Sequence, residues 1–334
     1  MNDQATVGVL DQFQTELVGC WQRLPNKGFF LVLLAGWLAL FQFLGNSIMG
    51  YINTPSLFGW MYEAYNSPNP AADDATGNFI PFLVLGLFWW RREELLALPL
   101  RMWLPGLGIF LAGVALHFFG YMIQEPHISI VALFVGIYGL MGLAWGPAWL
   151  RKSFFPFFLF VFCIPLGTHA DIITTRLRIL VCQLVETIAH SVLGIGVIRM
   201  GTQLFNPSGA YQYEVAPACS GIRSLFAILL LGTVYGFVTF RALWKRLLFM
   251  ALAFPFAVLG NLARMLLIVL AAELGGQETG NFVHENFICS LIPYIPAIVG
   301  LLFIGRLLEN REVAIGRLLE NREVAAARPE EKRP

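Results

Sequence analysis

The chain contains eight apolar stretches, most of them long enough to cross a membrane as a helix. A spanning α-helix needs roughly 20 mostly apolar residues. Hydrophobic residues make up 57% of the 334 residues and charged residues only 13%, whereas about 25% charged residues is usual in a soluble domain. We therefore expect an all-α polytopic membrane protein. The predicted spans are 29–48, 79–90, 103–121, 128–149, 153–168, 219–240, 247–272 and 286–308.

Basic residues are distributed along the chain as the positive-inside rule requires. The loops 49–78, 122–127 and 273–285 contain neither Lys nor Arg. Of the 22 basic residues, 17 lie before the first span, after the second, fourth and sixth spans, or in the C-terminal tail. This alternation predicts eight spans in the cytoplasmic (inner) membrane, with both termini in the cytoplasm and 169–218 on the outer side.

The predicted outer segment has its own local structure. Within 177–198, Gln183, Glu186 and His190 have the spacing i, i+3, i+7, which places them on one polar face of an otherwise apolar helix. This pattern predicts a helix that lies in the membrane interface. Residues 199–218 contain a turn signal, Asn-Pro-Ser-Gly, after which Tyr211, Tyr213 and Val215 alternate with polar neighbours. This pattern predicts a short β-hairpin or loop between spans five and six.

The rest of the chain divides simply. Residues 1–28 form a predicted cytoplasmic N-terminal segment, 29–308 a single transmembrane domain, and 309–334 a charged cytoplasmic tail. The sequence IGRLLENREVA occurs twice in tandem, at 304–314 and 315–325. Two units are too few for a solenoid, so we interpret the repeat as a duplication that lengthens the tail.

Composition and motifs exclude several functions. A net charge of +1 gives no electrostatic footprint for nucleic acid. The five cysteines show neither a CxxC pair nor Cys/His spacing typical of zinc, so we expect no metal and no cofactor. HExxH, GxSxG and P-loop motifs are absent from the sequence.

Three reactive side chains, far apart in sequence, fall near the outer ends of spans six to eight: Cys219, Arg264 and His284. An ionisable residue within or beside a span is a functional hypothesis by default. A cysteine thiolate is a nucleophile, histidine transfers protons near neutral pH, and arginine stabilises an oxyanion. The trio therefore predicts attack by Cys219 on a peptide carbonyl.

Neighbouring residues support this prediction. Ser220 and Gly221 are small and would let a substrate backbone approach the thiol. Arg223, at i+4 from Cys219, could bind an acidic group of a substrate, and Asn261 precedes Arg264 by three residues.

Non-catalytic interpretations of the individual residues stay open. A cysteine in an apolar protein is usually a small buried hydrophobe, as we expect for Cys20, Cys163, Cys182 and Cys289. A disulfide from Cys219 to Cys182 or Cys289, or an ion pair of Arg264 with Glu273 or Glu285, would also account for individual residues.

The motifs around the trio resemble those of the exosortase/archaeosortase family. EVAPACSGIRSLFAILLLG (214–232) resembles the family's nucleophile motif, NLARMLLIVLAAELG (261–275) its Asn-x-x-Arg motif, and FVHENF (282–287) its His motif. The similarity extends over about 79–305. One departure lies at 76–81, where the sequence TGNFIP lacks the His that many members carry.

The resemblance implies a membrane cysteine transpeptidase with Cys219, Arg264 and His284 as its catalytic residues. Its partners would be exported proteins that end in a short sorting motif, a transmembrane helix and a basic tail, together with membrane lipid. Cleavage at the outer face would proceed through a Cys thioester. The target motif, the acceptor, the subfamily and the oligomeric state are not determined by the sequence.

Two alternative functions remain at this point. One is a membrane transporter or channel in which Arg264, Arg223 and Glu273 line a polar path; broken helices at Pro255 and Pro293 would suit it. The other is a membrane peptidase that hydrolyses the same bond without transfer, because both reactions share the acyl-enzyme step.

Overall fold

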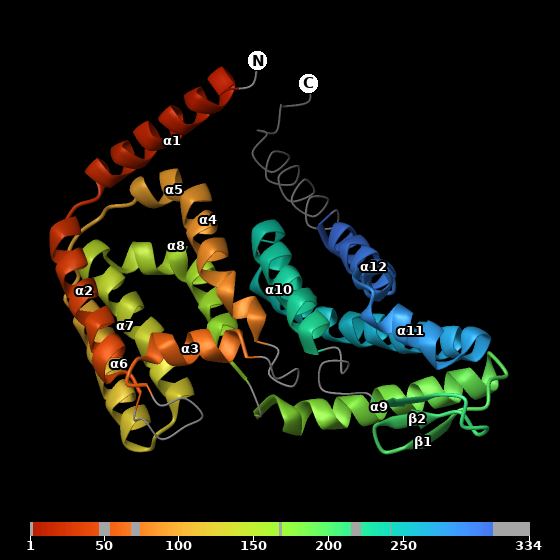
Figure 1. Cartoon of the computed structure of the whole chain (residues 1–334). Helices are drawn as coiled ribbons and strands as arrows, with labels where there is room; N and C mark the ends of the chain where they lie inside the picture. The colour runs from red at the N-terminus through yellow and green to blue at the C-terminus, as the bar shows by residue number, and fades with distance from the viewer. Residues whose placement is uncertain are drawn as a thin grey trace, which may run out of the picture. The chain divides into compact units, whose positions relative to one another are not determined.

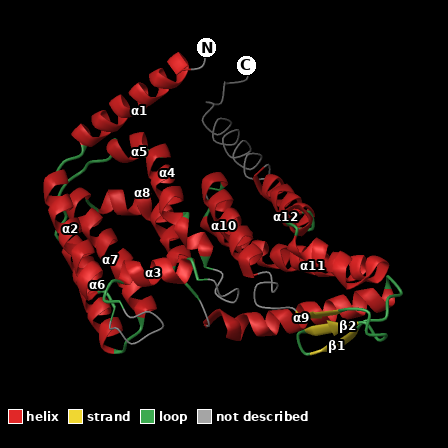
Figure 2. Ribbon diagram, in the orientation of Figure 1, coloured by secondary structure: helices red, strands yellow, loops and turns green. Residues whose placement is uncertain are grey.

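A computed structural model describes residues 3–46, 54–67, 74–166, 169–214, 222–240 and 242–309. The described chain is mostly helical, with a small β-sheet (Figures 1 and 2). It divides into two compact units, Met1–Gly167 (unit 1) and Thr168–Pro334 (unit 2). The mostly helical fold and the short β-structure between spans five and six were both predicted from the sequence.

In the described residues, unit 1 consists of α-helices and short 3-10 helices. Its elements are α1 (Asp3–Arg23), α2 (Lys27–Leu44), α3 (Leu57–Tyr65), the 3-10 helix η1 (Ala75–Asn78), α4 (Ile80–Trp90), α5 (Arg92–Leu96), α6 (Pro105–Met122), α7 (Pro126–Trp145), α8 (Pro147–Phe158) and the 3-10 helix η2 (Leu159–Cys163).

Glycines let α6 and α7 pack closely. A Cβ atom at Gly113 would lie 2.9 Å from the backbone nitrogen of Gly136, and one at Gly139 would lie 2.4 Å from that of Phe110. Apolar side chains gain little by associating in lipid, so membrane helices commonly pair through small residues that bring their backbones together. The α6–α7 pair has this type of interface.

Among the described residues, four helices are long and apolar enough to cross a membrane: α2, α6, α7 and, in unit 2, α11 (Leu243–Glu285). The other predicted spans coincide with shorter or interrupted helices. The span predicted at 79–90 is the 11-residue helix α4. The span predicted at 219–240 includes the apolar helical stretch Phe226–Thr239. The eight-span count therefore stays a prediction.

At the span predicted over 153–168, the apolar stretch of sequence is longer than the α-helix that it forms. Helix α8 begins at Pro147, ends at Phe158 and continues only as the 3-10 helix η2. Pro156 lies inside α8 and has no N–H to bond to the carbonyl of Lys152. Arg91 reaches that carbonyl instead, with Nη1 3.5 Å from the Lys152 oxygen. The apolar run is thus longer than the regular α-helix it forms.

Unit 2 combines helices with a three-stranded antiparallel sheet in the order β1-β2-β3. Its elements are α9 (His169–Ser191), β1 (Ile198–Met200), β2 (Gln203–Phe205), β3 (Gln212–Glu214), α10 (Ile222–Thr239), α11 and α12 (Phe287–Leu291). After a turn at 292–293 the chain is helical again over 294–309, so the span predicted at 286–308 is interrupted.

The helix predicted over 177–198 is α9, which begins earlier and ends at Ser191. Gly194 follows with a φ of +68°, a left-handed conformation that ends helices. The polar face has a specific partner, because the Glu186 carboxylate accepts hydrogen bonds from the backbone N–H and the Nε–H of Arg199 in β1, both at 3.2 Å. Whether α9 lies in the membrane interface stays a prediction.

One apolar core joins α9, the sheet and α11, and Figure 1 shows α9 alongside the sheet. Tyr211 and Tyr213 are buried in it while Gln212 between them is exposed, as the predicted alternation requires. Val215, the last residue of that alternation, lies outside the described residues. The remaining buried side chains of this core are Val181, Cys182, Val185 and Ala189 of α9, Ile195 and Val197 between α9 and β1, Leu204 of β2, and Leu262, Met265, Ile268, Val269 and Ala272 of α11.

Candidate active site

Helix α11 is interrupted at Gly276, which has φ +77° and ψ −176°. Almost only glycine adopts this backbone region, because a Cβ atom would be strained there. The first part, 243–275, contains the long apolar run. The second part, 277–285, carries Gln277, Glu278, Asn281 and Glu285 and is too polar for hydrocarbon. We therefore place the end of the membrane span before Gly276 and the second part outside it.

The interruption brings Arg264 and His284 together. Arg264 Nη2 donates a hydrogen bond to the backbone carbonyl oxygen of His284 at 3.3 Å, although the two residues are 20 positions apart. A straight helix of that length would separate them by about 30 Å. The chain must therefore fold back at Gly276, so that the second part packs against the first.

A further glycine allows this packing. A Cβ atom at Gly280 would lie 2.9 Å from the Cβ of Ala272 in the first part and 1.9 Å from the Tyr213 hydroxyl oxygen of β3. Only a residue without a side chain fits between the two neighbours. Gly280 is therefore needed both for the packing of the second part of α11 against the first and for the contact of β3 with α11.

The electrostatic environment of His284 favours a neutral imidazole. The pKa of His284 is lowered from its ordinary value, first because burial disfavours the charged ring and second because the Arg264 cation is nearby; Glu285 acts in the opposite direction. A neutral imidazole at neutral pH is able to accept a proton. Arg264 and His284 thus form a cation beside a potential base.

A glutamine side chain connects β3 to the second part of α11. The backbone N–H of Gln212 donates to Gln277 Oε1 at 2.8 Å, and Gln277 Nε2 donates to the Gln212 carbonyl oxygen at 3.2 Å. The amide therefore makes the same pair of bonds that a neighbouring strand would make. In addition, the Tyr213 hydroxyl donates to the Gln277 carbonyl oxygen at 3.1 Å.

Gln277 was not predicted from the sequence, because no local pattern marks a side chain that pairs with a distant strand. It lies seven residues before His284, and Gln212 lies seven residues before Cys219. The Gln277–Gln212 pair therefore joins the segment that carries the histidine to the strand that leads into the predicted nucleophile motif.

A family model described as "Transmembrane exosortase (Exosortase_EpsH)" matches residues 69–288, about two thirds of the chain. This protein belongs to the transmembrane exosortase family. The family predicted from the three motifs is thereby confirmed, and the matched range includes the positions of all three. No curated protein and no solved structure matches the chain.

The central part of the exosortase nucleophile motif, 215–221, lies outside the described residues. Cys219, Ser220 and Gly221 are not among them, and Arg223 is the second residue of α10, with its side chain outside the description. The predicted meeting of Cys219 with Arg264 and His284 therefore stays a prediction. Cys20, Cys163, Cys182 and Cys289 are free thiols in the structure.

The predicted site residue Asn261 is buried, with 2% of its surface exposed. Its Oδ1 accepts a hydrogen bond from the Tyr294 hydroxyl at 3.3 Å. Asn261 thus attaches the helical stretch 294–309 to α11, one turn before Arg264.

Of the two acids considered as partners of Arg264, Glu273 accepts a hydrogen bond from Asn206 at 3.1 Å. Within the described ranges, no group of three His, Cys, Asp or Glu side chains has metal-binding geometry.

Proposed function

We propose that this exosortase is a cysteine protease and transpeptidase that cleaves the C-terminal sorting signals of exported proteins. The targets would end in a short motif, a transmembrane helix and a basic tail. With eight spans and both termini inside, cleavage would occur at the outer face of the cytoplasmic membrane. The observation that carries the proposal is the fold-back that sets Arg264 beside His284 in a chain of the exosortase family.

The proposed reaction has two half-reactions. His284 takes the proton of the Cys219 thiol, and the thiolate attacks the carbonyl carbon of the scissile peptide bond. Arg264 binds the oxyanion of the tetrahedral intermediate. The C–N bond breaks, His284 returns the proton to the leaving amine, and a thioester remains. An acceptor nucleophile, or water, then attacks the thioester and releases the Cys219 thiol.

The described contacts suit these roles. Because the pKa of His284 is lowered, the imidazole is free to accept the thiol proton at neutral pH. Arginine stays charged at any physiological pH, so it serves as a fixed cation for the oxyanion. We assign Ser220 and Gly221 to close approach of the target backbone, Arg223 to an acidic group of the sorting motif, and Asn261 to holding the helix that carries Arg264.

The decisive experiment uses co-expression with an exported protein from the same genome whose C-terminus has the motif, helix and basic-tail organisation. We expect a shortened target with the wild type and an uncut target with Cys219→Ala. Cys289→Ala serves as the control, since it removes a different, half-buried thiol of unit 2 that the proposed reaction does not use. Undiminished cleavage by Cys219→Ala would refute the proposal.

A second measurement separates transfer from hydrolysis. Hydroxylamine attacks a thioester to give a hydroxamate at the new C-terminus of the target. With purified exosortase and target, we expect hydroxamate formation by the wild type and none by Cys219→Ala. If water is the natural acceptor, the product without hydroxylamine carries a free carboxylate; if a transfer occurs in cells, its mass includes the acceptor.

A further inference from the structure

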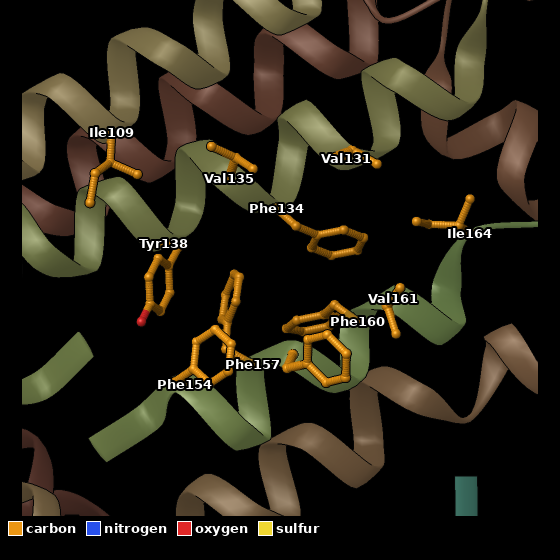
Figure 3. A pocket seen from close by; sticks show the side chains of 11 residues that line it. Ile109, Val131, Phe134, Val135, Tyr138, Phe154, Phe157, Phe160, Val161 and Ile164 are labelled. Atoms are coloured by element: carbon orange, nitrogen blue, oxygen red, sulfur yellow. The ribbon is translucent and has the colours of Figure 1, made fainter. Parts of the chain in front are cut away.

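Unit 1 contains an apolar groove between α7 and the continuous segment of α8 and η2 (Figure 3). Its volume is about 330 Å³, within the range of small-molecule sites. The lining residues are Ile109, Val131, Phe134, Val135, Tyr138, Phe154, Phe157, Phe158, Phe160, Val161 and Ile164. The Tyr138 hydroxyl already donates to the Leu150 carbonyl oxygen at 2.7 Å. An occupant of this groove must therefore be apolar.

Aromatic rings along the groove contact one another and hold its shape. Phe134 and Phe160 are stacked, with centroids 4.4 Å apart and an interplanar angle of 15°. Phe157 contacts Phe160 at 5.2 Å and Tyr138 at 5.0 Å. Such ring pairs each stabilise a fixed arrangement beyond their burial. The groove is thus formed in advance of any ligand.

The position of the groove along α7 places it among lipid chains. Val131 and Tyr138, at its two ends, both lie within Pro126–Trp145, a candidate membrane span. Apolar chains, rather than water, surround a helix at this depth. A flexible hydrocarbon chain is therefore the occupant with direct access to the groove.

A cation lies on the same helix face as one end of the groove. Arg151 precedes Phe154 by three residues and Phe158 by seven, a spacing that puts all three on one side of α8. Arg151 is exposed, and its Nε–H donates to the Pro147 carbonyl oxygen at 3.4 Å. The neighbouring Lys152 is paired with Glu94 at 3.0 Å. In the described part of the chain Arg151 has no such acidic partner.

We propose that this groove binds one acyl chain of an anionic phospholipid, with the lipid phosphate held by Arg151. The groove supplies an apolar site of fixed shape, and the guanidinium supplies the positive charge that a phosphate recognises bidentately. A zwitterionic lipid would fit the groove equally well, but its head group would interact less with a single cation. The site therefore selects lipids by head-group charge.

Native mass spectrometry of the full-length protein in detergent tests this site. The probes are phosphatidylglycerol and phosphatidylcholine with the same acyl chains. We expect the wild type to retain phosphatidylglycerol at one copy per chain, and Val135→Trp, which fills the groove, to lose it. Leu111→Trp is the matched control, because Leu111 is 55% exposed on α6 and does not line the groove. Arg151→Gln is expected to reduce the preference for phosphatidylglycerol about fivefold.

Thermal unfolding of each variant, with and without added lipid, shows whether the fold is intact, since a bound lipid raises the unfolding midpoint. If Val135→Trp does not fold, Val131→Phe repeats the test with a smaller increase in side-chain volume, at the end of the groove where Val131 lies. The proposal would be overturned if a groove-filling variant folded and retained phosphatidylglycerol as well as the wild type does. An unchanged lipid preference in Arg151→Gln would overturn it as well. The proposal would also fail if a second copy of the chain filled the groove, which would appear as a wild-type dimer that dissociates in Val135→Trp while lipid retention is unaltered.

Discussion

Arg264 donates a hydrogen bond to the backbone carbonyl of His284, so the two residues meet although 20 positions separate them. This contact requires the reversal at Gly276, and it accompanies a cation near the imidazole that adds to the effect of burial on its pKa. It also makes the candidate active site sensitive to changes outside the predicted catalytic trio.

The reversal itself depends on Gly276. We expect Gly276→Ala to lower the free energy of unfolding of unit 2 by about 1–3 kcal/mol, because alanine is strained at φ +77°. In the described part of the chain, no atom beyond the adjoining backbone lies within 4 Å of the position its Cβ would occupy, so the effect is one of backbone strain and not of collision. Thermal unfolding in detergent measures it. Gly108→Ala in α6, where the added Cβ also meets nothing within 4 Å, should be neutral or stabilising.

The pKa of His284 should respond to its two charged neighbours in opposite directions. Arg264→Gln removes a cation that lowers this pKa, so the pKa should rise; Glu285→Gln removes an anion that raises it, so the pKa should fall. NMR titration of His284 in the detergent-solubilised protein measures both shifts. Shifts of the same sign in the two variants would contradict the arrangement.

The same lowered pKa predicts how stability changes with pH. The unfolded chain binds a proton at His284 more readily than the folded chain, because the folded pKa lies below the ordinary value. The contribution of this residue is therefore present above the unfolded pKa and is lost as pH falls through the folded pKa. We expect unfolding midpoints of the wild type to fall on acidification below about pH 6.5, with a smaller fall in His284→Gln.

Gln277 should influence the reactivity of Cys219 without touching it. Gln277→Ala removes two hydrogen bonds to the backbone of Gln212, each contributing about 0.5–1.5 kcal/mol. If the proposed site is correct, Cys219 becomes less well placed beside His284, and its alkylation near neutral pH slows. For this measurement the other four cysteines are replaced, and the alkylation rate of Cys219 is measured as a function of pH.

Two further variants make the Gln277 test specific. Glu278→Ala changes the exposed neighbouring residue and should leave the alkylation rate unchanged. Gln277→Glu keeps an acceptor for the Gln212 N–H, but its carboxyl is ionised near neutral pH and has no donor for the Gln212 carbonyl. Its alkylation rate should therefore lie between those of Gln277→Ala and the wild type. Equal rates for Gln277→Ala and the wild type at every pH would show that the pair has no influence on the thiol.

The effects of substituting Asn261 and Tyr294 on the free energy of unfolding should be coupled. Asn261→Ala and Tyr294→Phe each remove the same 3.3 Å hydrogen bond between buried groups. A double-mutant cycle on thermal unfolding should therefore show a coupling free energy of about 1 kcal/mol. Strict additivity of the two substitutions would mean that the bond contributes nothing to stability.

Much of this protein follows from local sequence patterns. The apolar composition determines a helical membrane protein, because so much apolar surface cannot be buried in a soluble domain of this size. Alternation around Tyr211 and Tyr213 correctly predicts buried and exposed residues of a short strand region. Three sequence motifs, at 214–232, 261–275 and 282–287, are sufficient to identify the exosortase family.

The tertiary structure alone decided which distant residues meet. A Gly-Gly pair at 275–276 signals a break, but not the direction that the chain takes afterwards. That direction depends on Gly280 fitting between Ala272 and Tyr213, a contact between segments far apart in sequence. The pairing of Gln277 with Gln212 has the same origin. Hydropathy records how apolar each residue is, whereas these features depend on backbone hydrogen bonds and on packing between elements.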